Sequence, residues 1–228
     1  MGKLESKKVV MIAGGSRGIG KYLADNLQYK YAISVCGRSS EDYATEHFMS
    51  VACDLTLKKD VNNFVCTTLD KYGRIDAMIY NAGIFPYDDM LEVKERDVDA
   101  LYNIVIKGYL FVLQSVIPIM REQKKGYIIN IGSIRGLTVT PNKTAYSSMK
   151  RAAISMTESV SVENEKYGIK STSIHPSTVD TESSRERYGG NYNHLNLVKE
   201  KDILNIIEML FGLSEYAKID SIFVDGRL

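Results

Sequence analysis

Apolar residues form two kinds of segment along this chain, short continuous runs and longer stretches with helical spacing. Residues 8–13 form the first run, which ends in glycines, and residues 19–29 then show helical periodicity. A continuous run of this length is typical of a buried parallel strand, whereas helical spacing is typical of a helix that covers a sheet. The chain therefore opens with a predicted strand, a glycine turn and a helix.

The same alternation continues along the rest of the chain. Further strands are predicted at 32–36, 48–53, 75–80, 127–131, 170–175 and 221–224, and helices at 57–72, 95–123, 144–167 and 198–213. Pro118 predicts a bend or break near the end of the long helix. We therefore predict one α/β domain over residues 1–228, a Rossmann-like doubly wound parallel sheet of about seven strands with helices on both faces.

One long segment, 177–197, lacks strong periodicity and is rich in Ser, Gly, Asn and Arg. A loop of this length within a compact domain is usually either functional or disordered. We interpret it as a candidate substrate lid. Its polar and aromatic residues are Arg185, Arg187, Tyr188, Asn191, Tyr192 and His194.

The composition excludes several classes of function. The 29 basic and 28 acidic residues give a net charge of +1, which argues against nucleic acid as a partner. Cys36, Cys53 and Cys66 lack metal-ligand spacing, so we expect thiols and no metal. No apolar run approaches the ~20 residues of a membrane span, and no signal peptide is evident. We therefore expect a cytoplasmic protein without membrane contact.

Gly14, Gly18 and Gly20 lie between the first predicted strand and the first predicted helix. Glycines here let the backbone approach a pyrophosphate, which the amides of the helix N-terminus then bind. The alternative is a plain strand-to-helix turn. Because both flanking elements fit, we favour a dinucleotide site.

Tyr146 and Lys150 lie four residues apart in a predicted helix, and Ser133 lies thirteen residues before the tyrosine. The spacing places the phenol and the ammonium on one face, where the cation favours the phenolate. An unperturbed phenol titrates near ~10, so it needs such a neighbour to exchange protons near neutral pH. Tyr146 taken alone would be a half-buried helix residue, but the spacing favours acid/base chemistry.

These motifs together resemble the short-chain dehydrogenase/reductase family over nearly the whole chain. The resemblance is carried by residues 13–20, Cys53-Asp54-Leu55, Asn81-Ala82-Gly83, Ser133 with Tyr146 and Lys150, residues 175–181, and Val224-Asp225-Gly226. It implies that Tyr146 exchanges a proton with the substrate oxygen and that Ser133 holds this oxygen. It also implies that Lys150 lowers the tyrosine pKa and binds the nicotinamide ribose.

The resemblance also implies a set of cofactor-binding residues. Besides Tyr146 and Lys150 these are Gly14, Ser16, Arg17, Gly18, Ile19, Gly20, Arg38, Ser39, Asp54, Leu55, Asn81, Ala82, Gly83, Pro176, Val179 and Thr181. Arg38 stands at the end of the second strand, where NAD-preferring relatives usually carry an Asp. A guanidinium clasps the 2′-phosphate that a carboxylate would repel. We expect NADP(H) in preference to NAD(H); the alternative is that Arg17 and Arg38 are plain surface residues.

The sequence departs from the family pattern in the long helix. Counting back from Gly126 without gaps, Val105 occupies the position where relatives carry an asparagine that organises a water chain to the lysine. Asn103 would point to a different side of a regular helix. Either a helix distortion brings Asn103 round, or protons follow another route. Ala13 and Ser177 also replace the usual Thr and Gly, without removing chemistry.

The expected function is reduction of a ketone to a secondary alcohol with NADPH, or the reverse reaction. The substrate end contains Ile134, Arg135, Leu137 and Pro141, and is too polar for a steroid pocket. We expect a small polar or anionic carbonyl or alcohol substrate. The resemblance implies a homodimer or homotetramer through the long helix and the catalytic helix. The alternative function, which Val105 motivates, is a catalytically weak NADP(H)-binding sensor or assembly subunit.

Overall fold

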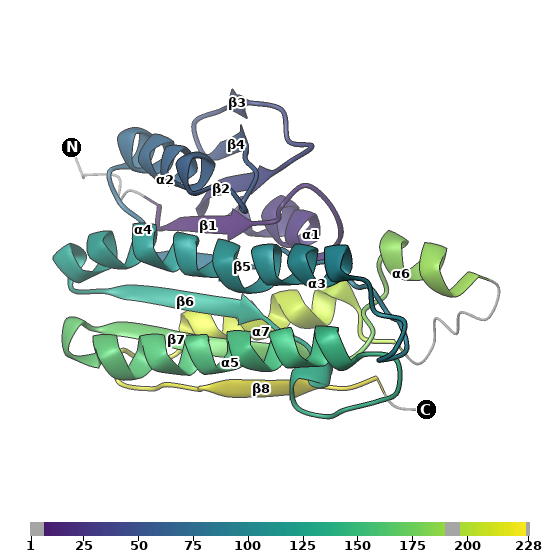
Figure 1. The fold of residues 1–228 in the computed structure, drawn as a ribbon. Coiled ribbons are helices and arrows are strands. Elements are labelled where there is room, and N and C mark those ends of the chain that lie inside the picture. The colour runs from purple at the N-terminus through teal and green to yellow at the C-terminus, as the bar shows by residue number, and fades with distance from the viewer. Residues whose placement is uncertain (1–6, 190–196, 227–228) are drawn as a thin grey trace, which may run out of the picture.

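The computed structural model describes residues 7–189 and 197–226. Eight strands form one sheet with the order β3-β4-β2-β1-β5-β6-β7-β8, parallel except where β3 pairs with β4 (Figure 1). The strands are β1 (Val9–Ala13), β2 (Ala32–Gly37), β3 (Tyr43–Ala44), β4 (Phe48–Ala52), β5 (Ala77–Tyr80), β6 (Gly126–Ile131), β7 (Ile169–Pro176) and β8 (Ser221–Val224). The predicted α/β fold is confirmed, and the short edge strand β3 is an addition to it.

Helices cover both faces of the sheet. The α-helices within the described residues are α1 (Gly18–Leu27), α2 (Lys58–Tyr72), α3 (Glu95–Leu101), α4 (Gly108–Gln123), α5 (Thr144–Asn164), α6 (Glu182–Tyr188) and α7 (Glu200–Gly212). The core residues of α2, α4 and α5 pack against one face, and those of α1 and α7 pack against the other. In Figure 1, α4 and α5 cross in front of the sheet, while α7 lies behind it.

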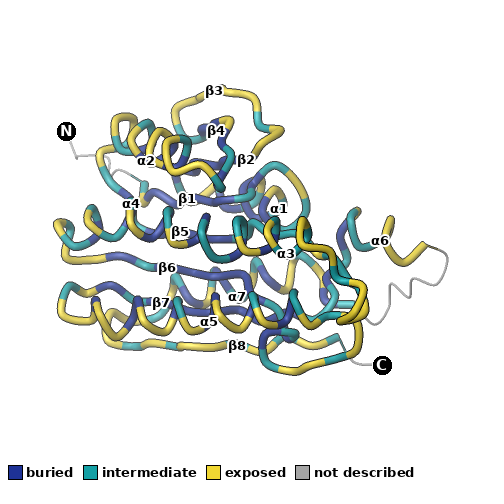
Figure 2. The backbone as a smooth tube through the Cα atoms, in the orientation of Figure 1, coloured by how far each residue is buried: buried dark blue, intermediate teal, exposed yellow. Residues whose placement is uncertain are grey.

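The central strand β1 shows why its sequence is continuously apolar. All five of its residues are buried, because Val10 and Ile12 enter one core cluster while Met11 and Ala13 enter the other. Successive side chains of a strand point to opposite faces, and both faces of this sheet are covered by helices. Figure 2 shows the same burial along the neighbouring central strands.

The predicted long helix is continuous but irregular. Between α3 and α4, residues Tyr102–Lys107 form a π-helical segment, and the helix does not break at Pro118, since α4 continues to Gln123. By length and apolar composition the stretch Glu95–Gln123 also has the properties of a membrane span, contrary to our expectation from the sequence. Core helices share these properties, and here Tyr109, Val112 and Val116 of α4 are buried against the sheet.

The candidate lid at 177–197 contains a short helix that its sequence did not predict. The Thr181 hydroxyl accepts a hydrogen bond from the Ser184 amide and so caps α6. Asp180, directly before this cap, forms ion pairs of 2.8 Å with Arg185 on α6 and with Lys199 ahead of α7. These contacts fix the base of the lid. Asn191, Tyr192 and His194 lie outside the described residues.

The glycine turn leaves no room for a side chain at Gly20. A Cβ there would lie 2.1 Å from the carbonyl oxygen of Gly14, which also accepts a hydrogen bond from the Asn81 side chain. Because backbone cannot move aside cheaply, Gly20→Ala should destabilise the protein by about 1–3 kcal/mol in urea unfolding. Gly212→Ala is the matched control, since a Cβ there meets nothing within 4 Å. Equal losses in both variants would contradict this geometry.

Candidate active site

The carboxyl ends of β1, β5, β6 and β7 meet at one edge of the sheet, where a cavity of about 160 Å³ opens. Its walls include Ile19, Asn81, Gly83, Ser133, Tyr146, Lys150, Pro176, Val179 and Thr181. The predicted catalytic residues and part of the predicted cofactor motifs therefore line one cavity. This is the edge at which doubly wound sheets bind ligands.

The glycine turn is tied to the two strands beside β1. The amides of Gly14 and Gly15 both donate to the carbonyl of Cys36 at the end of β2, at 3.0 and 2.9 Å. On the other side, the Asn81 amide donates to the carbonyl of Ala13 at 2.9 Å. The backbone thus anchors the turn to the sheet although Ala13 replaces a threonine.

The shape of the turn fits a dinucleotide phosphate. Gly14 has a φ of +86°, and a Cβ there would lie 2.8 Å from the Ala82 amide nitrogen. Helix α1 begins at Gly18 without a side-chain cap, so its first amides face outward for an anion. Gly14, Gly18 and Ala82 therefore form a cradle of backbone that a pyrophosphate can approach.

The remaining predicted cofactor residues lie along the ends of β2 and β4. Arg17, Arg38 and Ser39 are exposed, Ser16 is half-buried, and Leu55 is buried in the core. The hydroxyl of Ser16 would lie 2.7 Å from a Cβ on Gly37, so the turn packs closely on β2 just before Arg38. Asp54 accepts hydrogen bonds from the amide and the hydroxyl of Thr56, at 2.9 and 2.8 Å.

The three predicted catalytic residues come from two elements. Ser133 follows β6, and its hydroxyl accepts a hydrogen bond from the Arg135 amide at 3.2 Å. Tyr146 and Lys150 lie on α5 and are 2% and 5% exposed. The Lys150 ammonium donates to the carbonyl of Ile131 at 3.3 Å and lies 5.9 Å from the centre of the Tyr146 ring.

Burial decides the charge states of this pair. Burial and the neighbouring Tyr87 raise the pKa of Tyr146, and this outweighs the opposing effects of Ser133, Arg187 and Arg135. Burial likewise lowers the pKa of Lys150 to about 8. The spacing predicted an acidified tyrosine, but in the cofactor-free protein desolvation is the larger effect. At neutral pH the phenol is therefore protonated, and its raised pKa makes it a weaker proton donor than a solvated tyrosine.

The distortion that we considered for the long helix is present, but it does not bring Asn103 to the catalytic cavity. The Asn103 side chain accepts a hydrogen bond from Lys107 at 3.4 Å, and Val105 is 2% exposed in the core. Neither residue is among those that line the cavity. Instead, the Tyr80 hydroxyl at the end of β5 donates to the carbonyl of Ile104.

Sequence reasoning missed two aromatic residues beside Tyr146 and a lysine that contacts one of them. Phe85 and Tyr87 have ring centres 5.6 and 5.8 Å from that of Tyr146, and the Lys143 ammonium lies 4.4 Å from the Tyr87 ring centre. The only local signal is that both aromatics follow the Asn81-Ala-Gly motif closely.

The predicted substrate-end residues separate into two groups. Ile134, Arg135, Arg187 and Tyr188 line the cavity, whereas among the described residues Leu137, Pro141 and Arg185 are not part of its lining. The cavity wall therefore draws on the turn after β6 and on α6, as expected for a substrate site under a lid.

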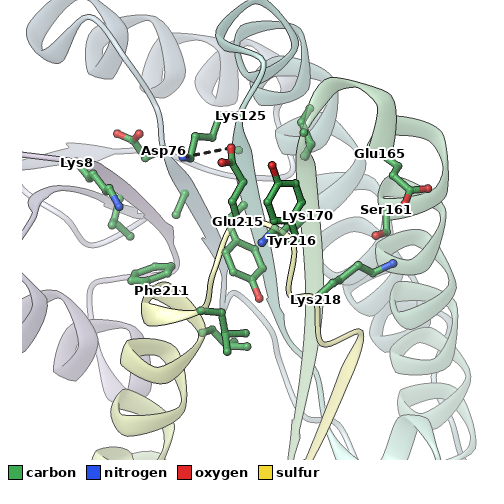
Figure 3. Close-up of a pocket in the computed structure, with 18 of the residues that line it drawn as sticks. Lys8, Asp76, Lys125, Ser161, Glu165, Lys170, Phe211, Glu215, Tyr216 and Lys218 are labelled. Carbon is green, nitrogen blue, oxygen red and sulfur yellow. Dashed lines mark ion pairs between the residues drawn. The ribbon is translucent and has the colours of Figure 1, made fainter.

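A larger cavity, of about 550 Å³, lies at the opposite, amino-terminal ends of the strands (Figure 3). Two of its lysines are held by local contacts: Lys125 pairs with Glu215 at 3.9 Å, and Lys170 donates to the backbone carbonyls of Ser214 and Ala217 at 2.9 and 2.7 Å. It contains none of the predicted catalytic residues. Volume alone therefore does not identify the active site.

The fold and this constellation define an oxidoreductase of the Rossmann-like class. The sequence profile of the short chain dehydrogenase family matches residues 8–190, and the chain belongs to this family. An uncharacterized oxidoreductase of Staphylococcus saprophyticus is 33% identical over 185 residues, covering 76% of this chain and 79% of the relative. One from Staphylococcus aureus is 32% identical over 182 residues, with coverages of 76% and 79%.

Solved structures with the same fold agree with the assignment to the short chain dehydrogenase family. ElxO with NADP bound superposes with a TM-score of 0.87 at 27% identity, covering 96% of this chain and 98% of that one. Levodione reductase superposes with a TM-score of 0.83 at 22% identity and 97% coverage of both chains, which supports the fold. NADP binding by a relative of this similarity agrees with the cradle described above.

His175 is a buried histidine beside the catalytic lysine. It is 0% exposed, and neither ring nitrogen has a hydrogen-bond partner among the described residues. Burial, and secondly the charge of Lys150, lower its pKa to about 4. His175 is therefore neutral at physiological pH.

The lowered pKa of His175 predicts that the free energy of unfolding decreases at acid pH. The unfolded chain protonates His175 near pH ~6.5 and the folded chain does not, so stability should fall as the pH decreases from about 6.5 towards 4. His175→Asn should make this decline shallower, as measured by urea unfolding across the pH range. Above about pH 7 the stability curves of the two proteins should run parallel. An unchanged slope at low pH would contradict the prediction.

Proposed function

We propose that this protein reduces a ketone to a secondary alcohol with NADPH. The observation that supports this most is that Ser133, Tyr146 and Lys150 share one cavity with Asn81 and Gly83 of the cofactor motif. The proton donor and the expected nicotinamide position therefore adjoin the same substrate space. A carbonyl placed there would contact both.

Each residue has a distinct role in the proposed reaction. When bound, NADPH supplies the hydride. Ser133 orients the carbonyl oxygen by a hydrogen bond, and Tyr146 gives its proton to this oxygen as negative charge develops. Lys150 holds positive charge beside the phenol and limits the cost of the phenolate that remains. Tyr146 starts protonated, as reduction requires, and the charges of Arg187 and Arg135 oppose the rise in its pKa that burial causes.

The proposed preference for NADP(H) rests on Arg17 and Arg38. Arg17 is exposed in the glycine turn and Arg38 is exposed directly after β2, and neither forms an ion pair with any residue that the structure describes. They are therefore available for a 2′-phosphate, which a guanidinium binds in a bidentate manner. ElxO, a relative with NADP bound, supports the same cofactor.

A catalytically weak NADP(H)-binding sensor is the second candidate. It is favoured by Val105 and Asn103, the two candidates for the position of the family's asparagine, because neither residue lines the cavity. Its signature would be tight NADPH binding without turnover of any ketone.

We also propose a cytoplasmic homodimer or homotetramer. Tyr102, Leu110 and Val162, on the long helix and on α5, are 46%, 40% and 78% exposed, which is typical of surfaces that associate. Cys36, Cys53 and Cys66 are free thiols, as is usual in a reducing compartment.

Tyr146→Phe should lower kcat for ketone reduction by about 10²- to 10⁴-fold, because it removes the proton donor. NADPH binding, measured by calorimetry, should stay near the wild-type value. Tyr29→Phe, at a tyrosine that is 79% exposed, is the matched control and should leave kcat unchanged. Unchanged turnover in Tyr146→Phe would exclude this residue from the mechanism. Absence of turnover by the wild-type protein, with tight NADPH binding, would favour the sensor.

Arg38→Asp should reverse the cofactor preference. The variant loses the hydrogen bond between the guanidinium and the 2′-phosphate, and its carboxylate repels that phosphate. It should reduce kcat/KM for NADPH by about 10- to 100-fold and change kcat/KM for NADH less. Arg96→Asp introduces the same charge change on α3, at a side chain that is 76% exposed, and should affect neither cofactor. Equal losses for both cofactors in Arg38→Asp would contradict 2′-phosphate recognition.

A further inference from the structure

Three cations converge on the catalytic cavity from three separate elements. Arg135 lies in the turn after β6, Lys143 directly precedes α5, and Arg187 lies on α6. All three line the cavity, and no Asp or Glu is among its described lining residues. The mouth of the active site is therefore strongly positive, although the whole chain has a net charge of +1.

Aromatic rings, and not carboxylates, hold two of these cations in place. The Arg187 guanidinium lies 4.8 Å from the ring centre of Phe85 and 4.9 Å from that of Tyr87. The Lys143 ammonium also lies over the Tyr87 ring, 4.4 Å from its centre. Cation–π contacts orient a charge without neutralising it. The positive charge thus remains available to a ligand.

The carboxylate at the base of the lid is already engaged by other cations. Asp180, at the base of the lid, pairs with Arg185 and Lys199, both at 2.8 Å. Arg185 lies half a turn from Arg187 on α6, so the same helix presents one arginine to a carboxylate and one to the cavity. No ion pair involves Arg135, Lys143 or Arg187 within the described part of the chain.

The two arginines act on Lys143 and on Tyr146. Burial, then Arg135 and Arg187, lower the pKa of Lys143, and both arginines also oppose the rise in the pKa of Tyr146. Like charges held this close in a partly desolvated site repel, and a bound anion relieves the repulsion. The arrangement is therefore that of an anion site next to the proton donor.

We propose that the substrate is a small oxo acid, whose carboxylate is held by Arg135, Lys143 and Arg187 while its ketone is reduced. The cavity of about 160 Å³ suits a small molecule. This inference rests on the proposed reductase function. The ketone carbon gains the hydride supplied by NADPH, the oxygen gains the Tyr146 proton, and the carboxylate is unchanged. The products are a hydroxy acid and NADP⁺.

The test compares oxo acids with their methyl esters, which keep the shape of the acid and remove its charge. Aliphatic acids with the keto group in the alpha, beta or gamma position serve as probes. The wild-type protein should prefer one acid over its ester by at least about 10-fold in kcat/KM. Arg187→Gln and Arg135→Gln should each raise KM for the acid by about 10- to 100-fold relative to KM for the ester, whereas any change that acts through the Tyr146 pKa should alter kcat for both substrates equally.

Arg185→Gln is the matched control, because it removes the same charge from the same helix outside the cavity. If Arg185→Gln shifts the lid, kcat/KM should change equally for the acid and for the ester. Arg187→Lys should retain part of the preference for the acid. Equal use of acid and ester by the wild-type protein, or unchanged selectivity in the glutamine variants, would overturn the oxo-acid proposal and leave the reductase proposal intact.

If turnover is low, a binding experiment separates the proposed anion site from the proposed reductase function. Calorimetry with the Tyr146→Phe protein saturated with NADPH measures the affinity for acid and ester without reaction. Acid-selective binding that Arg187→Gln abolishes would support the anion site even if no ketone is reduced. Equal binding of both probes would overturn it.

Discussion

A buried ammonium group organises the catalytic edge of this protein. Lys150 is 5% exposed, and its described hydrogen-bond partner is the carbonyl of Ile131 at the end of β6. Burying a cation is costly unless it is paired with polar groups, so the elements around it must approach closely. Gly136 permits this approach, because a Cβ there would lie only 3.1 Å from the Lys150 backbone.

The same burial links the chemistry of the site to its stability. The pKa of Tyr146 rises and the pKa values of Lys150 and His175 fall mainly because each group is removed from water. Each shift favours the neutral form. Burial therefore lowers stability at acid pH through His175 and weakens Tyr146 as an acid, so that proton transfer from Tyr146 depends on nearby positive charge.

The sequence predicted the features that depend on local spacing and missed those that depend on burial or on distant contacts. Alternating apolar runs were sufficient for the sheet, and the spacing of Tyr146 and Lys150 was sufficient to place both at one cavity. Helix α6 was missed because it contains no buried residue, so its sequence has no apolar periodicity to detect. Phe85 and Tyr87 lie about 60 residues before Tyr146 in the chain, and no local pattern places their rings against it. The effect of desolvation on the Tyr146 pKa likewise cannot be read from spacing.

The π-helical segment Tyr102–Lys107 has a consequence for comparing this chain with its relatives. A turn that holds an extra residue rotates everything before it by about 100° relative to a regular helix. If a relative has a regular helix here, counting residues without gaps no longer matches equivalent positions before this segment. Side chains paired by such counting would point in different directions in the two proteins. Structural superposition, and not sequence offset, is the sound basis for deciding which residue of this helix replaces the asparagine of other family members.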